Sequence, residues 1–542
     1  MLRPPLSRKG IALLACLALA GCGSGGSGSG GGDTLEGTYD SFPDYLDPAL
    51  SFTLEGATAM HDTYIPLLTY RPASGAAGTE LIPGLARTLP KIDQRGRRYT
   101  LYLRPGLEYS DGTPVRASDF RFAVERLIRL NSGGSSFYMG IAGAQRFAQT
   151  KKGGIGGIES DDTTGKVVIH LLEPSGTFSY VLALPFGAPL PPGTPAEDQT
   201  QQPPPATGPY VITAVRPGRS WEYERNPVWA KVNGPALPQL PGGHVGKIRF
   251  EVRSNSSTQV EEVERGEVDW MKNPPPPERY AAVRGRYEGS QFREDPTISV
   301  YYFWMNTRQP PFDDVRVRQA VNHAVDPAAL ERIYAGTLRG TQQVLPPQMP
   351  GYRRFRLYPY EPARAKRMVE RADPAERKVT VWTLDLPPTD EAGEYYEQVL
   401  DELGFDVTLK TVSATNYFTL IGSAETPDLD TGFGNWLLDY PHPDDYFRPQ
   451  LSGESIIPAG NTNWAHFADP PVDREIRQLG REQLGPRQER EYAALDRRVM
   501  KQAPWAPFGT LTLGTFVADT VDLDELVVSP IYGQDLASFQ LK

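Results

Sequence analysis

One carboxylate in the last quarter of the chain stands among aromatic and apolar residues: Asp439, within the segment WLLDY at 436–440. A carboxylate removed from water is costly unless it meets a cation. A ligand-binding site in which this carboxylate pairs with a cationic group of the ligand would explain an acid in these surroundings. The alternative is local, because Asp often caps a turn and Pro441 follows. The segment predicts a ligand-binding acid at Asp439 with Trp436 and Tyr440 beside it, and turn capping stays open.

The same segment holds four side chains that can ligate metals, namely Asp439, His442, Asp444 and Asp445. Only one of them is a histidine, and prolines constrain the loop, so we expect no metal site and no cofactor. Motifs typical of enzymes are absent from the sequence, including H-E-x-x-H, a Cys cluster, G-x-S-x-G and a Walker loop. Without a nucleophile beside a base, the sequence does not predict an enzyme.

Aromatic and amide side chains at the end of an apolar run form a second group of candidates. Trp304 and Asn306 end the run Ile298–Met305, which has the composition of a strand. Side chains alternate along a strand, so half of them face a core, and the sequence does not say which half. Tyr39 and Phe42, near the start of the mature chain, form a third group. We predict that Trp304, Asn306 and Tyr39 contribute to the ligand site, with core packing as the alternative.

The N-terminal residues have the composition of an export signal. Basic residues precede an apolar run at 11–20, which is too short to span a bilayer as a stable helix. The next residues, LAGC at 19–22, resemble a bacterial lipobox. That resemblance implies cleavage before Cys22 and a lipid on this residue. The alternative is an ordinary signal peptide with an incidental cysteine.

A flexible tether follows the predicted cleavage site, because residues 23–32 are only Gly and Ser. We expect a signal peptide at 1–21 and a lipidated tether at 22–33. The body of the protein would then be exported and anchored by the lipid on Cys22 to the outer face of the cytoplasmic membrane, or to the periplasmic side if the cell has two membranes.

The composition is that of a large folded body. The chain has 542 residues, 39% of them hydrophobic and 10% aromatic, which suits a core. Its formal net charge is −10 and it has no basic block, so we expect no nucleic-acid binding. Both cysteines, Cys16 and Cys22, lie in the N-terminal signal region. The mature fold therefore contains no disulfide.

Strands and helices alternate between runs of turn residues, which is typical of α/β proteins. The predicted strands are 99–104, 166–172, 247–252, 298–305, 379–384 and 406–412. The predicted helices begin after Ser118 and after Asp313 or Asp314, and cover 257–265, 362–372 and 390–403. The strand–helix–strand order at 379–412 predicts a parallel pair with a right-handed crossover.

Seven stretches, in order along almost all of the mature chain, resemble the extracytoplasmic solute-binding proteins of peptide-type ABC importers (family 5, the oligopeptide, dipeptide and nickel-binding group). They are Tyr39–Pro48, Tyr109–Leu127, Thr207–Asn226, Arg265–Asp269, Trp304–Asp326, Glu361–Ala372 and Asn435–Phe447. Each stretch alone is weak evidence for the family, but the seven stretches together are specific for it. The turn Asp111-Gly-Thr-Pro114 within the second stretch is interpreted as scaffold, because Asp and Gly suit a tight turn and Pro ends a strand.

The resemblance implies an α/β, two-lobe, periplasmic-binding-protein-like fold with a hinge between the lobes and an extra subdomain in the first. We expect the first lobe at 34–292, with 56–204 as the inserted subdomain and 506–542 returning to it. The second lobe is expected at 293–505, so that two chain crossings join the lobes.

The resemblance also implies a function. The protein would bind a solute between the lobes, most simply a short peptide whose α-ammonium pairs with Asp439, and would deliver it to an ABC permease driven by a separate ATPase. We expect a monomer. Three alternatives stay open: a metal chelate, opine or oligosaccharide as ligand of the same fold, a membrane-anchored secreted hydrolase, and a structural lipoprotein without a small ligand.

Overall fold

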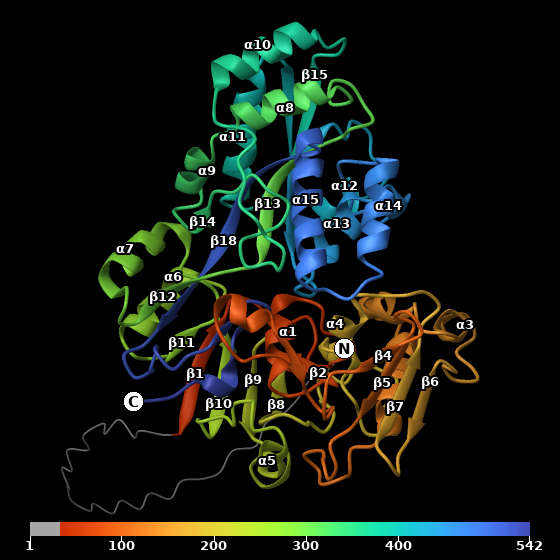
Figure 1. The fold of residues 1–542 in the computed structure, drawn as a ribbon. Helices are drawn as coiled ribbons and strands as arrows, with labels where there is room; N and C mark the ends of the chain where they lie inside the picture. The colour runs from red at the N-terminus through yellow and green to blue at the C-terminus, as the bar shows by residue number, and fades with distance from the viewer. Residues whose placement is uncertain (1–32) are drawn as a thin grey trace, which may run out of the picture. The chain divides into compact units, whose positions relative to one another are not determined.

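A twelve-stranded mixed sheet runs through the part of the chain that the computed structural model describes, residues 33–542 (Figure 1). The expectations for the signal peptide, for Cys22 and for the tether up to residue 32 lie outside this range. Along its main path the sheet has the order β16-β15-β17-β13-β18-β11-β1-β10-β9-β8, and β12 and β14 also pair with β18. No helix within residues 33–542 is long and apolar enough to cross a membrane. The strands of this sheet are β1 (Thr34–Tyr39), β8 (Tyr210–Arg216), β9 (Ser220–Arg225), β10 (Lys247–Val252), β11 (Trp270–Met271), β12 (Phe292–Pro296), β13 (Ser299–Met305), β14 (Leu338–Arg339), β15 (Lys378–Leu384), β16 (Asp406–Val412), β17 (Thr431–Leu437) and β18 (Trp505–Val517).

Strand β18 joins the two halves of this sheet. Its first residues pair antiparallel with β13, from Trp505 to Gly509, and its last residues pair antiparallel with β12 and β11. The strand has 13 residues, more than twice the usual length. In Figure 1 it runs as one blue arrow from the region of β13 down to that of β11 and β12. A single strand therefore takes part in the ladders of both lobes.

The two lobes have separate hydrophobic cores. One cluster of buried side chains is drawn entirely from residues between Ile298 and Phe508. The three other clusters are drawn from residues 35–292 and 516–539. We call these two sets of residues the second lobe and the first lobe. The fold class is confirmed as α/β with two lobes.

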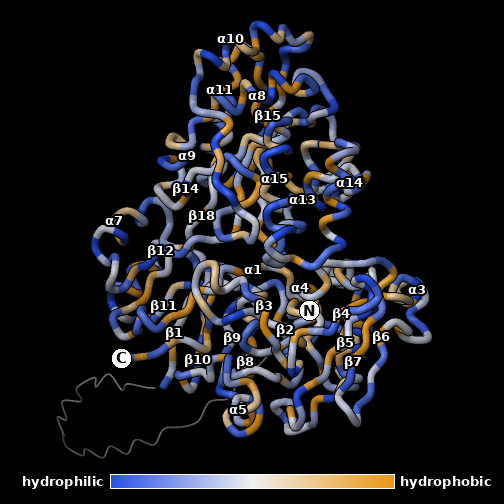
Figure 2. Tube along the Cα trace, in the orientation of Figure 1, coloured by the Kyte–Doolittle hydropathy of each residue, from blue (hydrophilic) through white to orange (hydrophobic). Residues whose placement is uncertain are grey.

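The first lobe contains a four-stranded antiparallel sheet besides its share of the large one. Its order is β4-β5-β7-β6, with β4 (Lys91–Asp93), β5 (Arg98–Tyr102), β6 (Ile158–Asp161) and β7 (Lys166–His170). Hydrophobic residues occur along β5 and β7, as the colours in Figure 2 show. Two-stranded pairs complete the strands: β2 (Leu68–Tyr70) with β3 (Leu81–Pro83), and β19 (Val528–Ser529) with β20 (Gly533–Gln534).

Helices cover the sheets in both lobes. Those of the first lobe are α1 (Leu54–His61), α2 (Ala117–Arg129), α3 (Ala144–Thr150), α4 (Phe178–Val181), α5 (Gly234–Ala236), α6 (Ser256–Glu264) and α7 (Pro277–Tyr287). Those of the second lobe are α8 (Val315–Ala324), α9 (Pro327–Ile333), α10 (Pro362–Ala372), α11 (Thr389–Glu402), α12 (Ala414–Ile421), α13 (Asp444–Leu451), α14 (Pro470–Leu479) and α15 (Pro486–Gln502).

Most predicted elements are present, and the helix expected after Ser118 as its cap begins two residues earlier. Strands β15 and β16 are parallel, as the strand–helix–strand order predicts. Asp314 caps α8 by accepting a hydrogen bond from the backbone N–H of Arg316. Ser118, in contrast, does not cap α2, because the helix begins at Ala117 and the Ser118 hydroxyl bonds to Asp162. The first turn of α2 is closed instead by the Asp119 carboxylate, which accepts from the Arg116 N–H.

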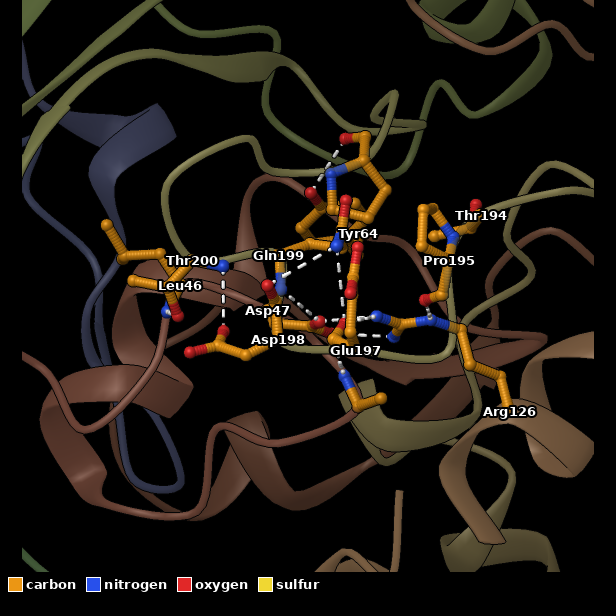
Figure 3. A network of polar contacts seen from close by, with 12 residues as sticks. Leu46, Asp47, Tyr64, Arg126, Thr194, Pro195, Glu197, Asp198, Gln199 and Thr200 are labelled. Atoms are coloured by element: carbon orange, nitrogen blue, oxygen red, sulfur yellow. Dashed lines mark hydrogen bonds and ion pairs between the residues drawn. The ribbon is translucent and has the colours of Figure 1, made fainter. Parts of the chain in front are cut away.

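A buried ion pair fixes the proline-rich loop of the first lobe. Arg126 of α2 forms two hydrogen bonds with the Asp47 carboxylate, 2.8 Å from Nη1 to Oδ1 and 2.5 Å from Nη2 to Oδ2 (Figure 3). The two side chains are 1% and 0% exposed. The same guanidinium donates to the carbonyls of Pro195 and Glu197, and Asp47 also accepts from the Gln199 N–H. These contacts tie three distant segments together and leave neither charge uncompensated.

Candidate functional site

A largely apolar cavity of about 280 Å³ lies between residues of both lobes. Enclosed sites for small molecules usually span roughly 300–1,000 Å³, so this one suits a short ligand. The wall is made of side chains from distant parts of the sequence. It consists of Ser51–Leu54, Ala57, Phe137, Leu184–Phe186, Asp295–Ile298, Leu437–Asp439, Leu513 and Val528–Gly533.

Asp439 is one of two acidic residues in this wall. It follows β17, in a loop that Pro441 and Pro443 stiffen before α13 begins. Its side chain is half-buried. The other acid of the wall, Asp295, is already paired with Arg293 at 2.9 Å. Asp439 is therefore the acid of the cavity wall that a ligand cation can meet.

The partner of the Asp439 carboxyl is a second carboxyl, that of Asp445. The two side chains are hydrogen-bonded to each other, and Asp445 Oδ2 also accepts from the Asp439 N–H at 3.0 Å and from Trp436 Nε1 at 3.2 Å. Burial raises the pKa of Asp439 to about 6. Burial, and next the neighbouring Asp439, raise the pKa of Asp445 well above its usual range. Full ionisation of both acids is therefore disfavoured, because two neighbouring like charges repel each other.

No cation of the described chain compensates this pair. No Lys, Arg or His within residues 33–542 forms an ion pair with Asp439 or Asp445. Asp444, the next acid in sequence, differs because Arg448 binds it at 2.7 Å. Asp444 is therefore part of an ion pair within the protein, whereas Asp439 and Asp445 can bind a cation from outside it.

The donors considered for a metal site are partly committed to the protein itself. His442 Nδ1 accepts the Asp444 N–H at 3.0 Å, and Asp444 is bound to Arg448. Burial lowers the pKa of His442 to about 4, so the ring is neutral. With these two side chains engaged, the segment 439–445 offers the carboxyl pair rather than a set of metal ligands.

The other predicted residues of this segment lie around the cavity without lining it. Trp436 positions Asp445 through its indole N–H. Tyr440 lies against the first lobe, with ring centroids 6.3 Å from Phe137 and 6.1 Å from Tyr180. Phe137 itself lines the cavity. Of the predicted trio, Asp439 is the residue that reaches the wall.

Three predicted site residues lie in the cores instead, and the prediction is corrected for them. Trp304 is fully buried and donates its indole N–H to the Phe433 carbonyl at 2.9 Å. Asn306 is also fully buried, and its amide donates to the Leu429 carbonyl at 2.8 Å. Tyr39 packs edge-on against Trp221 and Phe250, with 0% exposure. Each of these side chains is buried within its own lobe, and none of them lines the cavity.

Sequence reasoning missed most of the cavity wall. The segments 51–57, 184–186 and 528–533 contain no charged pattern that would single them out. Two apolar residues of the wall are exposed in the structure, Phe52 at 53% and Leu437 at 45%, but this exposure is not visible in the sequence. The sequence alone does not show that these loops converge.

A second carboxyl pair lies outside the cavity and ties the C-terminal segment to α1. Asp62 accepts the Leu536 N–H and Asp535 accepts the Ala537 N–H, both at 2.9 Å, and the two carboxyls are hydrogen-bonded to each other. Within the described residues, His61, Asp62 and Asp535 are the one group whose potential metal-ligand atoms lie within 4.8 Å of one another. The backbone contacts assign the two carboxyls a structural role.

This pair predicts that stability falls as pH rises. Burial raises the pKa of Asp62 to about 7 and that of Asp535 to about 8, above the unfolded value near 3.9. The stabilising protons are fully bound below the unfolded pKa and are lost as pH rises through the folded values. Asp535→Asn keeps the backbone contact and removes the titration. We expect it to be more stable than wild type at pH 8.5 by about 1–3 kcal/mol, and to gain little at pH 5.

Calorimetric melting of wild type and variant between pH 5 and 8.5 measures this difference. Asp524→Asn, an exposed change on the same segment, is the control and should follow wild type. Parallel pH profiles for wild type and Asp535→Asn would contradict the raised pKa of Asp535.

Comparisons with known proteins agree on one family. A family model described as bacterial extracellular solute-binding proteins, family 5 Middle, matches residues 80–456. Probable di/tripeptide-binding protein 5 of Pseudomonas aeruginosa (strain UCBPP-PA14) is 24% identical over 394 residues, 70% of each chain. Heme-binding protein A of Haemophilus influenzae (strain ATCC 51907 / DSM 11121 / KW20 / Rd) is 26% identical over 463 residues, 79% of each chain. The solved structure of clavulanic acid biosynthesis oligopeptide binding protein 2 shares the fold with a TM-score of 0.85 at 24% identity, covering 94% of this chain and 95% of that one.

Proposed function

We propose that this chain, which belongs to the bacterial extracellular solute-binding proteins of family 5, binds a short peptide in the cavity between its lobes and delivers it to an ABC permease. The observation that carries the proposal is the carboxyl pair of Asp439 and Asp445 at an apolar wall, without a cation of its own. A peptide α-ammonium supplies the missing charge, and its side chains fit the apolar surroundings. A probable di/tripeptide-binding relative supports the peptide as ligand class.

The binding site would close by a hinge motion between lobes. We propose the first lobe at 34–292 and 506–542, with 56–204 as its inserted subdomain, and the second lobe at 293–505. The core that spans Ile298–Phe508 supports this division to within a few residues, since Ala506 and Phe508 still belong to that core, and β12 and β18 lie where the chain would cross. A ligand that contacts both walls favours the closed state through its differential affinity.

We propose binding without catalysis, by a monomer. The cavity wall carries Ser51, Thr53, Thr297 and Ser529 as hydroxyl groups, and it contains no His or Lys to act as their base. A bound peptide would therefore be held and released unchanged.

The experiment that tests this function is native mass spectrometry of freshly purified protein, followed by calorimetry with leucyl-leucine and its N-acetyl derivative. We expect a mass addition that corresponds to a small peptide, and tighter binding of the free amine than of the N-acetyl form. If no peptide adds mass and neither compound binds, the peptide assignment is wrong.

Anchoring is a separate part of the proposal, and it predicts an effect of changing Cys22. The basis is the sequence LAGC at 19–22 and the Gly/Ser run that follows. Cys22→Ser removes the lipid acceptor, so the body should leave the membrane fraction, and its melting temperature should stay the same because a Gly/Ser sequence has no apolar side chains to add to a core.

Fractionation of cells that express wild type or Cys22→Ser, with immunoblotting, measures this outcome. Ser24→Ala, a change within the tether, is the control and should remain with the membranes. Sedimentation of Cys22→Ser with membranes would show that the anchor is something else.

A further inference from the structure

A lysine is buried next to the cavity without an anionic partner. Lys272 follows β11 and is 3% exposed. Its backbone N–H donates to the Thr38 carbonyl at 2.9 Å, but within the described chain its ammonium forms no hydrogen bond or ion pair. Burial lowers the pKa of Lys272 to about 8, and the charge of Glu55 opposes this only in part. A buried ammonium without a partner is costly, so a reason for its position is required.

The ammonium lies directly behind one residue of the cavity wall. Lys272 Nζ is 3.2 Å from the point that a Cβ atom on Gly533 would occupy. Gly533 lines the cavity, and so does Leu513, whose Cδ2 lies 3.8 Å from the same point. Gly533 adopts φ +76°, a conformation that favours glycine. Because Gly533 has no side chain, only its backbone lies between the Lys272 ammonium and the cavity.

The two walls of the cavity therefore carry opposite, uncompensated charges. Asp439, from the second lobe, presents the carboxyl pair. Lys272, in the first lobe, holds a cation behind Gly533. Most of the lining between them is apolar, with residues such as Phe52, Leu184 and Ile531. This arrangement is complementary to a short zwitterion with an apolar middle.

We propose that Lys272 is an anion-binding residue of the cavity and pairs with a carboxylate of the solute, while Asp439 pairs with its ammonium. The inference rests on the peptide-binding function proposed above and deepens it, because it specifies a small zwitterionic ligand with apolar side chains. The carboxylate is either the peptide C-terminus or an acidic side chain. The cavity volume of about 280 Å³ fits a ligand of dipeptide size.

Calorimetry at pH 7 with three peptides tests this role. Leucyl-leucine carries a terminal carboxylate, and leucyl-leucinamide carries none. In leucyl-glutamic acid α-amide the terminus is amidated, so its only carboxylate is that of the side chain. We expect wild type to bind a carboxylate-bearing peptide roughly 30-fold or more tightly than leucyl-leucinamide, because leaving one member of a buried charge pair unpaired has effects of this size. The peptide that shows the preference identifies which carboxylate Lys272 meets.

Lys272→Met removes the charge and keeps an unbranched side chain. It should reduce the preference to within about threefold and leave the affinity for leucyl-leucinamide unchanged. The melting temperature of the empty protein should stay the same or rise, whereas a purely structural lysine would give a lower one. Lys152→Met, an exposed change, is the matched control and should keep the full preference.

The outcomes distinguish this inference from the proposed function. Equal binding of all three peptides to wild type would overturn the role of Lys272 and leave peptide binding intact. Binding of none of them would overturn both. The comparison of acid and amide on wild type decides the matter even if Lys272→Met does not fold.

Discussion

Asp439→Asn should weaken the binding of a peptide with a free amino terminus by roughly 2–5 kcal/mol. The variant keeps the size of the side chain but has no charge to offer the ligand ammonium, which is then buried without its partner. The empty protein should be as stable as wild type or more stable above pH 6, because the pKa of Asp439 is raised to about 6 by burial and its ionisation opposes folding there.

Calorimetry with leucyl-leucine and N-acetyl-leucyl-leucine, on wild type and on the variant, measures the pairing directly. Acetylation should weaken binding to wild type far more than to Asp439→Asn. Asp428→Asn, on an exposed position before the same strand, is the control and should bind as wild type does. A loss of stability of about 1 kcal/mol with unchanged affinity would assign Asp439 to turn capping instead.

Arg126→Met should destabilise the protein by about 3–5 kcal/mol, because it leaves the Asp47 carboxylate buried and uncompensated. The change also removes the donors for the carbonyls of Pro195 and Glu197, so we expect the loop around them to become more accessible to proteases.

Denaturant unfolding of wild type and Arg126→Met measures the free-energy difference. Arg129→Met lies on the same helix, but its ion pair with Glu125 spans 3.7 Å and its side chain is 37% exposed. This control should change the free energy of unfolding by about 1 kcal/mol or less. Equal effects of the two substitutions would show that the Asp47 pair adds nothing beyond an ordinary surface pair.

Much of the local structure could be predicted because it depends on local patterns. Strands β10 and β16 and helix α10 have the predicted bounds. Each combines a clear hydrophobic period with a turn residue or proline at its edge. The long-range pairing could not be predicted in this way. The parallel ladder of β1 with both β10 and β11, for example, joins segments more than 200 residues apart.

The site was predictable only where a residue conflicts with its surroundings. Asp439 could be singled out because an acid among aromatic residues needs an explanation. Trp304 could not be assigned, since all seven residues of β13 are buried and alternation therefore carries no information about the cavity. Lys272 was missed because a lysine after a strand looks like an ordinary surface residue until its burial is known.

The loop Val528–Gly533 supplies part of the cavity wall, and Thr58 of α1 holds this loop by donating its hydroxyl to the Tyr532 carbonyl. Thr58 itself does not line the cavity. The shape of the wall therefore depends on a residue that a solute does not touch, and a change there can alter selectivity from outside the site.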